Sequence, residues 1–432
     1  MRILVYSYNY HPEPIGIAPL MTELAEGLVS RGHEVRVVTA MPNYPERKIY
    51  SDYRGRLFSE EVRNGVHIQR CFVAIRPNPG LVTRVLLDGS FALLSFFQAI
   101  KGWRPDVILS TSPSLPASVP VAAVKTLFSC PVVLSLQDIL PEAAVQTGLI
   151  TNKVAIRAFE LLEKFAYATV DRIAVITPSF ADNLMGKGVP SEKMNCISNW
   201  VDVNFIRPKS KTDNAFRRKH GLQDKFVVLY SGNIARTQGV RSIVRAAEQL
   251  RDQAHIQFVI VGEESQLADL DALKQELGID NLKLLPFAPR QELPEMLAAA
   301  DVSLIMQKKN VVGFNMPSKT MVLLASGRPV IASVPRDGAA ARAIRDSKGG
   351  IVTPPENPSL LAKAILNLSK DPERAESFGQ RGRQYAVTNY SFDQAIDAYE
   401  SLLKTLVTKP VNSLLRPAEP ASIGPVEKAT GL

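Results

Sequence analysis

Lys319 is the residue whose position points most directly to chemistry. It follows Pro317 and Ser318 at the start of a helical run, where free backbone amides and a cation together bind phosphate. Proline at the first position of a helix and serine in its first turn also fit a plain capped helix, in which the lysine faces solvent. Both interpretations stay open on this motif alone.

A second anion-binding pattern begins at Gly232, directly after an apolar run. Glycine lets the backbone approach a ligand closely, and the amides at the start of the following helix favour anions. Asn233 and Gln238 offer neutral hydrogen bonds, and Arg236 offers a charge-assisted one. Short glycine motifs also match by chance, so this motif alone favours an ordinary turn with a surface arginine.

The first half of the chain carries two further candidate loops. Pro12, Pro14 and Gly16 bend the segment before the first helix, which either faces a ligand or is simply rigid. It is not a G-x-G-x-x-G pattern, which argues against a dinucleotide site. Asp138 and Glu142 follow another apolar run, where an acid can bind a hydroxyl or accept a proton. A helix N-cap uses the same residues and is the better interpretation of this motif alone.

Alternating strands and helices must position these loops. The short β-branched runs that read as buried strands of a parallel sheet are residues 2–8, 33–40, 106–111, 131–137 and 172–177. Helical spacing follows two of these runs, over 18–32 and 152–170, and the whole pattern restarts at residue 226 after a polar, basic segment. We therefore predict an α/β protein with two Rossmann-like, doubly wound domains facing across a cleft, where ligands bind at strand carboxyl ends.

Composition agrees with two soluble domains, because 432 residues exceed one ordinary core and 46% of them are hydrophobic. The net charge of +9 is spread over both halves without an arginine tract, so it suits an anionic ligand or membrane face and gives no support to nucleic-acid binding. Three distant cysteines and five scattered histidines predict neither a disulfide framework nor a metal site, and a reducing compartment fits. We expect no signal peptide and no membrane-spanning segment.

Two segments read as mostly structural. Residues 80–105 are apolar over a wide arc and have basic neighbours, namely Arg76, Arg84, Lys101 and Arg104. The segment either dips into a membrane surface or is a buried helix, and Asp88, which interrupts the arc, favours the buried helix. Residues 408–432 contain four prolines and little pattern, which predicts a disordered tail.

Taken together, the loops resemble a GT-B glycosyltransferase of family 4 over residues 1–407. The motifs that fall in this family's order are RGHEVRVVT, SNWVDVNFIRP, YSGNIARTQGV, FVIVGEESQL, LPFAPRQELPEMLAAADVSLI and GRPVIA. NYHPEPIGIA, MPNYPERKIYSDY and SGNIARTQGV are most similar to its bacterial exopolysaccharide and O-antigen branch. That branch includes colanic-acid fucosyltransferase-like and L-N-acetylfucosamine transferase-like proteins.

The resemblance implies an acceptor-binding domain over residues 1–203, a nucleotide-sugar domain over 204–385 and a helix over 386–407 that crosses back to the first domain. The donor-binding residues that it implies are Gly16, Ile17, Gly232, Asn233, Gln238, Phe287, Asn315, Met316, Pro317 and Ser318. Phe287 would lie at the nucleobase. Arg236 and Lys319 would stabilise the leaving diphosphate, and Asp138 would act on the acceptor side.

The reaction implied is transfer from a nucleoside-diphosphate sugar to a polyprenyl-diphosphate-linked oligosaccharide, in exopolysaccharide or lipopolysaccharide synthesis. It would retain the anomeric configuration and use neither metal nor cofactor. The enzyme would be cytoplasmic, with peripheral contact to the inner membrane left open. Two other functions also stay open: a sugar-nucleotide epimerase of the same fold, and a non-catalytic partner of a polysaccharide assembly complex.

The sequence departs from the family pattern around the phosphates. Family members usually have arginine and lysine where this chain has Asn233 and Gln238, and we expect Arg236 and Lys319 to replace their positive charge. Family members usually have a histidine after the strand that we predict over residues 131–137. This chain has Gln137 and Asp138 there.

A second departure concerns acids. Family members usually carry two glutamates separated by seven residues, and the matching positions here are Phe314 and Val322. The second glutamate usually holds the ribose hydroxyls, so that contact must come from elsewhere. The missing acids are the reason for keeping the non-catalytic alternative.

Overall fold

The computed structural model describes residues 1–14, 16–76, 81–112, 114–140, 142, 152–235, 237–311 and 316–408, without the side chains of Leu81, Val82 and Arg84. Three site predictions, at Arg236, Phe314 and Asn315, lie outside these residues. So does the predicted tail, apart from Thr408.

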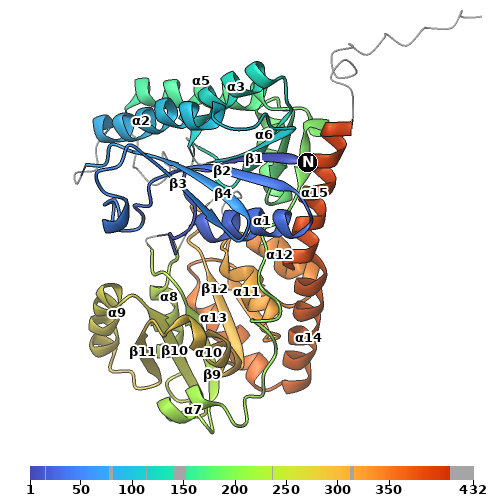
Figure 1. Cartoon of the computed structure of the whole chain (residues 1–432). Helices are drawn as coiled ribbons and strands as arrows, with labels where there is room; N and C mark the ends of the chain where they lie inside the picture. The colour runs from blue at the N-terminus through green and yellow to red at the C-terminus, as the bar shows by residue number, and fades with distance from the viewer. Residues whose placement is uncertain are drawn as a thin grey trace, which may run out of the picture.

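The first sheet has eight strands in the order β3-β4-β2-β1-β5-β6-β7-β8 (Figure 1). Its strands are β1 (Arg2–Tyr6), β2 (Glu34–Ala40), β3 (Phe58–Arg63), β4 (Val66–Cys71), β5 (Val107–Thr111), β6 (Val132–Leu136), β7 (Arg172–Val175) and β8 (Met194–Cys196). All neighbours are parallel except β3 and β4, an antiparallel edge pair that the sequence pattern did not predict. The helices are α1 (Ala18–Ser30), α2 (Leu81–Ile100), α3 (Ser118–Phe128), α5 (Lys153–Thr169) and α6 (Pro178–Gly186).

The second sheet has six parallel strands in the order β11-β10-β9-β12-β13-β14. Its strands are β9 (Phe226–Ser231), β10 (Ile256–Gly262), β11 (Leu282–Pro286), β12 (Val302–Met306), β13 (Val330–Ser333) and β14 (Gly350–Thr353). The helices are α7 (Ala215–His220), α8 (Arg241–Gln249), α9 (Glu264–Leu277), α10 (Leu293–Ala298), α11 (Lys319–Ala325), α12 (Ala339–Ser347), α13 (Pro358–Ser369) and α14 (Pro372–Asn389).

Both sheets have an apolar core on each face, which explains why their central strands are short runs of β-branched residues. In the first sheet, Leu4 and Tyr6 pack beneath α2, α3 and α5, while Ile3 and Val5 point to the opposite core with α1. The predicted fold, with two Rossmann-like α/β domains, is therefore confirmed.

The last helix, α15 (Phe392–Thr408), returns to the first domain as predicted. Ile396, Tyr399 and Leu403 are buried in the same core as β1, and the Tyr399 hydroxyl lies 2.8 Å from Ser135 Oγ in β6. The chain crosses between the domains where the amide of Val201 donates to the carbonyl of Tyr390 at 2.8 Å. Two segments, around Val201 and around Tyr390, therefore run side by side between the domains.

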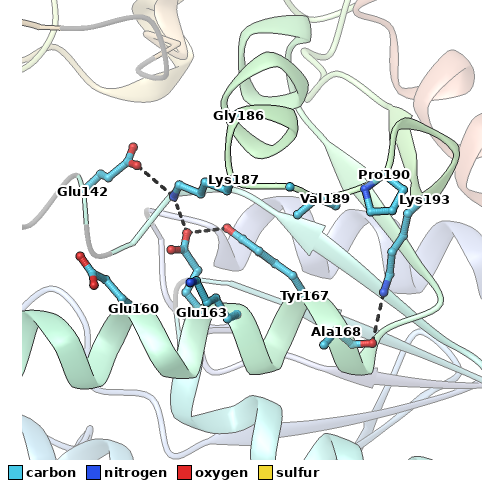
Figure 2. Close-up of a pocket in the computed structure, with 12 residues that line it drawn as sticks. Glu142, Glu160, Glu163, Tyr167, Ala168, Gly186, Lys187, Val189, Pro190 and Lys193 are labelled. Atoms are coloured by element: carbon cyan, nitrogen blue, oxygen red, sulfur yellow. Dashed lines mark hydrogen bonds and ion pairs between the residues drawn. The ribbon is translucent and has the colours of Figure 1, made fainter.

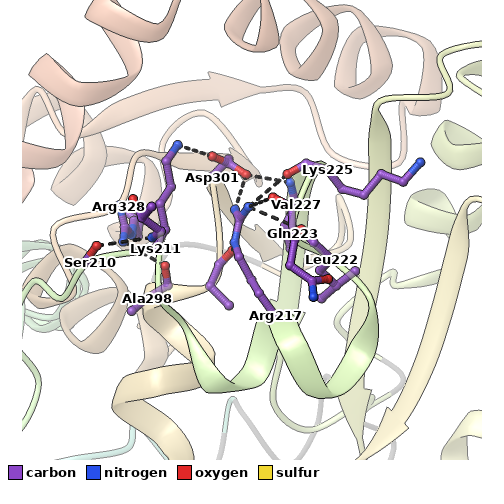
Figure 3. A network of polar contacts seen from close by, with 12 residues as sticks. Ser210, Lys211, Arg217, Leu222, Gln223, Lys225, Val227, Ala298, Asp301 and Arg328 are labelled. Carbon is purple, nitrogen blue, oxygen red and sulfur yellow. Dashed lines mark hydrogen bonds and ion pairs between the residues drawn. The ribbon is translucent and has the colours of Figure 1, made fainter.

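A buried polar network holds the segment between the domains onto the second domain (Figure 3). Asp301, at the start of β12, accepts hydrogen bonds from Lys211, from Arg217 of α7 and from the Val227 amide, the last at 2.8 Å. Arg217 and Asp301 are both buried, so each needs the other to compensate for its lost hydration. The network explains how an irregular basic segment becomes part of a rigid domain.

Candidate active site

The predicted loops lie at the carboxyl edges of the two sheets. In each sheet the strand order reverses at one point, between β1 and β5 in the first and between β9 and β12 in the second. Connections leave such a point towards opposite faces, and a crevice opens there that commonly binds ligands. Gly16 follows β1, Asp138 follows β6 and Gly232 follows β9, so the chain places all three at these edges.

Lys319 and the glycine loop are brought into contact. The Lys319 ammonium nitrogen lies 3.9 Å from the centre of the Tyr230 ring, at the end of β9. Gly232 has a φ of +135°, and a Cβ atom there would lie 2.8 Å from the same nitrogen. The backbone conformation at position 232 therefore favours glycine, and a larger residue there would also displace the end of the Lys319 side chain.

The expectation that Lys319 faces solvent is wrong. Its nitrogen is buried and has no hydrogen-bond partner among the described residues. Burial lowers the pKa of Lys319 from 10.5 to about 7, since a charged ammonium loses hydration there and the Tyr230 ring returns only part of it. The sequence motif could not show this, because Tyr230 lies far from Lys319 along the chain.

Hydrogen bonds between side chains and the backbone hold the glycine loop. The Tyr230 hydroxyl donates to the carbonyl of Asn233 at 2.7 Å, and the Ile234 amide donates to Gln266 Oε1 of α9 at 2.9 Å. Gln238 keeps a buried side-chain oxygen that has no partner within the described part of the chain. Tyr230 and Gln266 lie in the motifs YSGNIARTQGV and FVIVGEESQL, but the sequence analysis gave neither of them a role in the site.

The start of α11 differs from the prediction by two residues. The helix begins at Lys319, so Pro317 precedes it and Ser318 occupies the N-cap position without a side-chain capping bond. Pro317 is buried and Ser318 is exposed. Met316 and Ser318 line a cavity of about 350 Å³ that both domains enclose, and Arg342 of α12 lines it too.

The loop after β1 is held by a buried carboxylate that the sequence analysis missed. Glu13 accepts hydrogen bonds from the amides of Asn43 and Tyr44 at 2.7 and 2.8 Å, which ties this loop to the one after β2. Gly16 is exposed with a φ of +72°, so its backbone is accessible to a ligand. Ile17 is half-buried and packs on the core beside α1.

Asp138 is exposed, and its amide and that of Gln137 both donate to Ser112 Oγ after β5. The protein atoms around its carboxyl raise the pKa of Asp138 to about 6 by desolvation. Because solvent still reaches the residue and screens its charge, we expect the carboxylate to be ionised at neutral pH. The residues that would form the helix after it are mostly outside the described part, so the N-cap alternative stays open.

Gln137 links β6 to α15 through hydrogen bonds. Its side chain accepts a hydrogen bond from Asn199 at 2.7 Å and donates to Ser135 Oγ at 3.1 Å, and Ser135 Oγ also contacts the Tyr399 hydroxyl. Because an amide does not titrate, these bonds do not depend on pH. The described contacts of Gln137 are therefore structural.

The candidates of the two domains do not meet directly. Among the described residues, no hydrogen bond or ion pair joins Asp138 or Gly16 to Lys319. Phe287 is 52% exposed after β11, and Val322 is half-buried against the core. The residues fall into two groups, one on each side of the cleft.

The family relationship rests on nearly the whole chain. Residues 16–200 match the glycosyl transferase 4-like domain and residues 212–385 match glycosyl transferases group 1. A putative colanic acid biosynthesis glycosyl transferase of Escherichia coli K12, WcaI, is 33% identical over 339 residues, which are 77% of this chain and 83% of the relative. The chain is a family 4 glycosyltransferase. A probable glycosyltransferase of Pseudomonas aeruginosa, WbjE, is 26% identical over 79% of this chain and 85% of its own.

Solved glycosyltransferase structures share the fold. Sucrose-phosphate synthase from Thermosynechococcus elongatus superposes with a TM-score of 0.72 at 16% identity, covering 94% of this chain and 99% of its own. Anabaena HepE in complex with UDP has a TM-score of 0.70 at 17% identity, with 94% and 100% covered. The glycosyltransferase therefore has the predicted GT-B architecture, while a fucosyltransferase-like specificity stays a prediction.

Proposed function

We propose that this glycosyltransferase moves a sugar from a nucleoside-diphosphate sugar to a polyprenyl-diphosphate-linked oligosaccharide, in the synthesis of a bacterial exopolysaccharide or O-antigen. The Escherichia coli relative is named for colanic acid biosynthesis, which supports a polysaccharide product. Retention of the anomeric configuration and independence of metals and cofactors are parts of the proposal. The enzyme would work in the cytoplasm and meet the inner membrane peripherally, where such an acceptor is anchored.

The observation that carries the proposal is the buried ammonium group of Lys319 beside Gly232. A buried cation without an anionic partner is costly, and a ligand that supplies the anion recovers that cost on binding. The position at the reversal of a parallel sheet suits a diphosphate. As the sugar–phosphate bond breaks, negative charge grows on the leaving diphosphate, and Lys319 would stabilise it.

Other residues would complete the donor site from both sides of the cleft. In the second domain, the residues proposed to contact the donor are Gly232, Asn233, Arg236, Gln238, Phe287, Asn315, Met316, Pro317 and Ser318. Gly16 and Ile17 would approach the diphosphate from the first domain. HepE was solved with UDP and with UDP-glucose, but at 17% identity it leaves the choice between UDP and GDP open here.

On the acceptor side, Asp138 would orient the attacking hydroxyl or accept its proton. The exposed position of Asp138 after β6 supports this role, since a large acceptor needs an open approach. Closure of the domains would then exclude water and protect the donor from hydrolysis.

A thermal-shift series with UDP, GDP and their sugars tests the donor part of the proposal. We expect one nucleotide and its sugar to raise the melting temperature, since a ligand at about 100 times its Kd stabilises by about 2.7 kcal/mol. Transfer to a lipid-linked oligosaccharide should persist in EDTA. No shift with any nucleotide would favour the non-catalytic alternative, and conversion of a donor without an acceptor would favour the epimerase.

A further inference from the structure

Three helices of the first domain expose a group of large apolar side chains. Helices α2, α3 and α5 lie side by side over the first sheet, on the side away from the second domain (Figure 1). The exposed apolar residues on these helices, which we name the outer apolar face, are Val85, Leu86, Leu93, Phe97, Val119, Leu127, Val154, Leu161 and Phe165. They are nine of the 18 large apolar residues exposed in the described part of the chain. Large apolar side chains that are exposed together on neighbouring helices point to a site of interaction.

Helix α5 differs from an ordinary surface helix, because it buries a carboxylate and exposes large apolar side chains. Its Glu163 is buried and accepts hydrogen bonds from Tyr167 and from Lys187 after α6, at 2.9 and 2.6 Å (Figure 2). Leu161 and Phe165, which would normally point to the core, are instead 57% and 41% exposed. A cavity of about 700 Å³ lies beside these polar groups, while Ala166 and Tyr167 of the same helix are buried. Helix α5 therefore carries apolar side chains on its outer side as well as on the side that packs on the sheet.

Helix α2 continues the face with the exposed residues Val85, Leu86, Leu93 and Phe97. Asp88, which interrupts the apolar arc in the sequence, is buried beneath the helix, so the exposed positions 85, 89, 93 and 97 follow one another at helical spacing. The preference for a buried helix over 80–105 is therefore only half right: one side of α2 is core and the other is exposed. None of the described helices is long and apolar enough to cross a membrane, so α2 can lie on a bilayer but not span it.

The charges beside the outer apolar face favour a lipid surface over a second copy of the chain as its partner. Lys153, Arg157 and Lys164 are exposed on α5, and the one partly exposed acid of the three helices, Glu160, is paired with Arg157 at 3.2 Å. A second copy of the chain would bring cations against cations. A surface of phosphates above hydrocarbon matches both the cations and the apolar stripe.

We propose that the outer apolar face docks the first domain on an anionic lipid bilayer, with the cations of α5 at the lipid phosphates. Leu161, Phe165 and the apolar residues of α2 would enter the boundary between headgroups and acyl chains. The inference supplies the residues for the peripheral membrane contact proposed above, but its test uses neither donor nor acceptor. The two proposals can therefore fail separately.

Co-sedimentation of the full chain with vesicles tests the proposal. We expect binding to vesicles of phosphatidylglycerol and phosphatidylcholine to be at least about tenfold tighter than to phosphatidylcholine alone, and to weaken with salt. Leu161→Glu/Phe165→Glu should reduce binding by about tenfold or more. The matched control is Leu360→Glu on α13, where the leucine is 42% exposed, and it should bind as the unsubstituted chain does.

A charge variant keeps the test decisive if the glutamates disturb the packing of α5. Lys153→Gln/Lys164→Gln leaves the apolar stripe intact, and it should abolish the preference for the anionic vesicles. Circular dichroism and thermal unfolding check the fold of each variant. Equal binding to both vesicle types, full binding by both variants, or a dimer in light scattering that Leu161→Glu/Phe165→Glu converts to monomer would overturn the proposal.

Discussion

The two domains share a β/α architecture but treat their surfaces differently. Of the 18 large apolar residues exposed in the described part of the chain, 15 lie within residues 1–203 and only Phe287 and Leu360 lie within 204–385. The titratable groups at the two sheet edges differ in the same sense. Asp138 in the first domain is exposed, whereas the nitrogen of Lys319 in the second is buried.

This difference agrees with the two ligands proposed above, an acceptor at the first domain and a nucleotide sugar at the second. An exposed acid and an apolar outer surface suit a large amphiphilic partner that is never fully enclosed. A buried cation suits a small anion that displaces water completely. We call the first domain, with its exposed Asp138, the open half, and the second domain, with its buried Lys319 nitrogen, the closed half. The polar network around Asp301 is the frame of the closed half.

Loss of Asp301 should have the largest effect, because it removes the frame of the closed half. Asp301→Ala leaves Arg217 buried without its partner, which we expect to lower the free energy of unfolding of the second domain by about 3–5 kcal/mol. Hydrogen exchange measured by mass spectrometry should show faster exchange in β9 and β12, with β1 and β5 unchanged. Asp213→Ala, which removes an exposed partner of Arg218, is the control and should cost about 0–1 kcal/mol. If Asp301→Ala changed hydrogen exchange equally in both domains, the network would not stabilise the second domain specifically.

Lys319→Met tests the buried cation itself. We expect donor affinity to fall about 10- to 100-fold, since hydrogen bonds to a charged group contribute about 1.5–3 kcal/mol. In the unsubstituted chain, affinity should also weaken as the pH rises through about 7, where half of the Lys319 ammonium groups have lost their proton. Calorimetric titration at several pH values measures both, and the exposed Lys363→Met is the control.

The same variant should change stability in the opposite direction. The pKa of Lys319 is lower in the folded chain than its ordinary value of 10.5, so the unfolded chain binds more protons between pH 7 and 10.5. The cost of the buried charge is therefore complete below pH 7 and disappears towards pH 10.5. Lys319→Met should raise the melting temperature at pH 6 and have little effect at pH 10. A constant difference would mean that Lys319 is not buried as a cation.

Asp138→Asn should have the smallest effect, and it tests the exposed acid of the first domain against the buried cation of the second. We expect transfer to slow by about tenfold, below the roughly 10²–10⁴-fold typical of a general acid or base, because solvent still reaches Asp138. Transfer by the unsubstituted chain should fall as the pH drops through about 6, where Asp138 gains a proton, and the variant should lack this dependence. Steady-state kinetics should show donor affinity unchanged. Asp106→Asn, at the opposite edge of the same sheet, is the control, and equal effects would return Asp138 to a capping role.

Much of the fold and some of the site could be predicted because their causes are local. Strand and helix periodicity placed β1, β2 and α1 within a few residues, and the loops after β1, β6 and β9 followed from the parallel sheet. The start of α11 was misplaced, since Pro317 and Ser318 fit two adjacent helix positions equally well. Glu13 was missed because its partners, the amides of the loop after β2, carry no side-chain signal.

The sequence by itself determined the order of strands and helices, the family and the sheet edges that carry the candidate residues, because these depend on neighbours along the chain. Only the tertiary structure decided how individual charges are surrounded. Lys319 is buried because β9 brings Tyr230 and Gly232 against it. Glu163 is buried where Lys187 lies across from α5 and pairs with it. Burial depends on partners that are distant in sequence, and periodicity alone does not specify them.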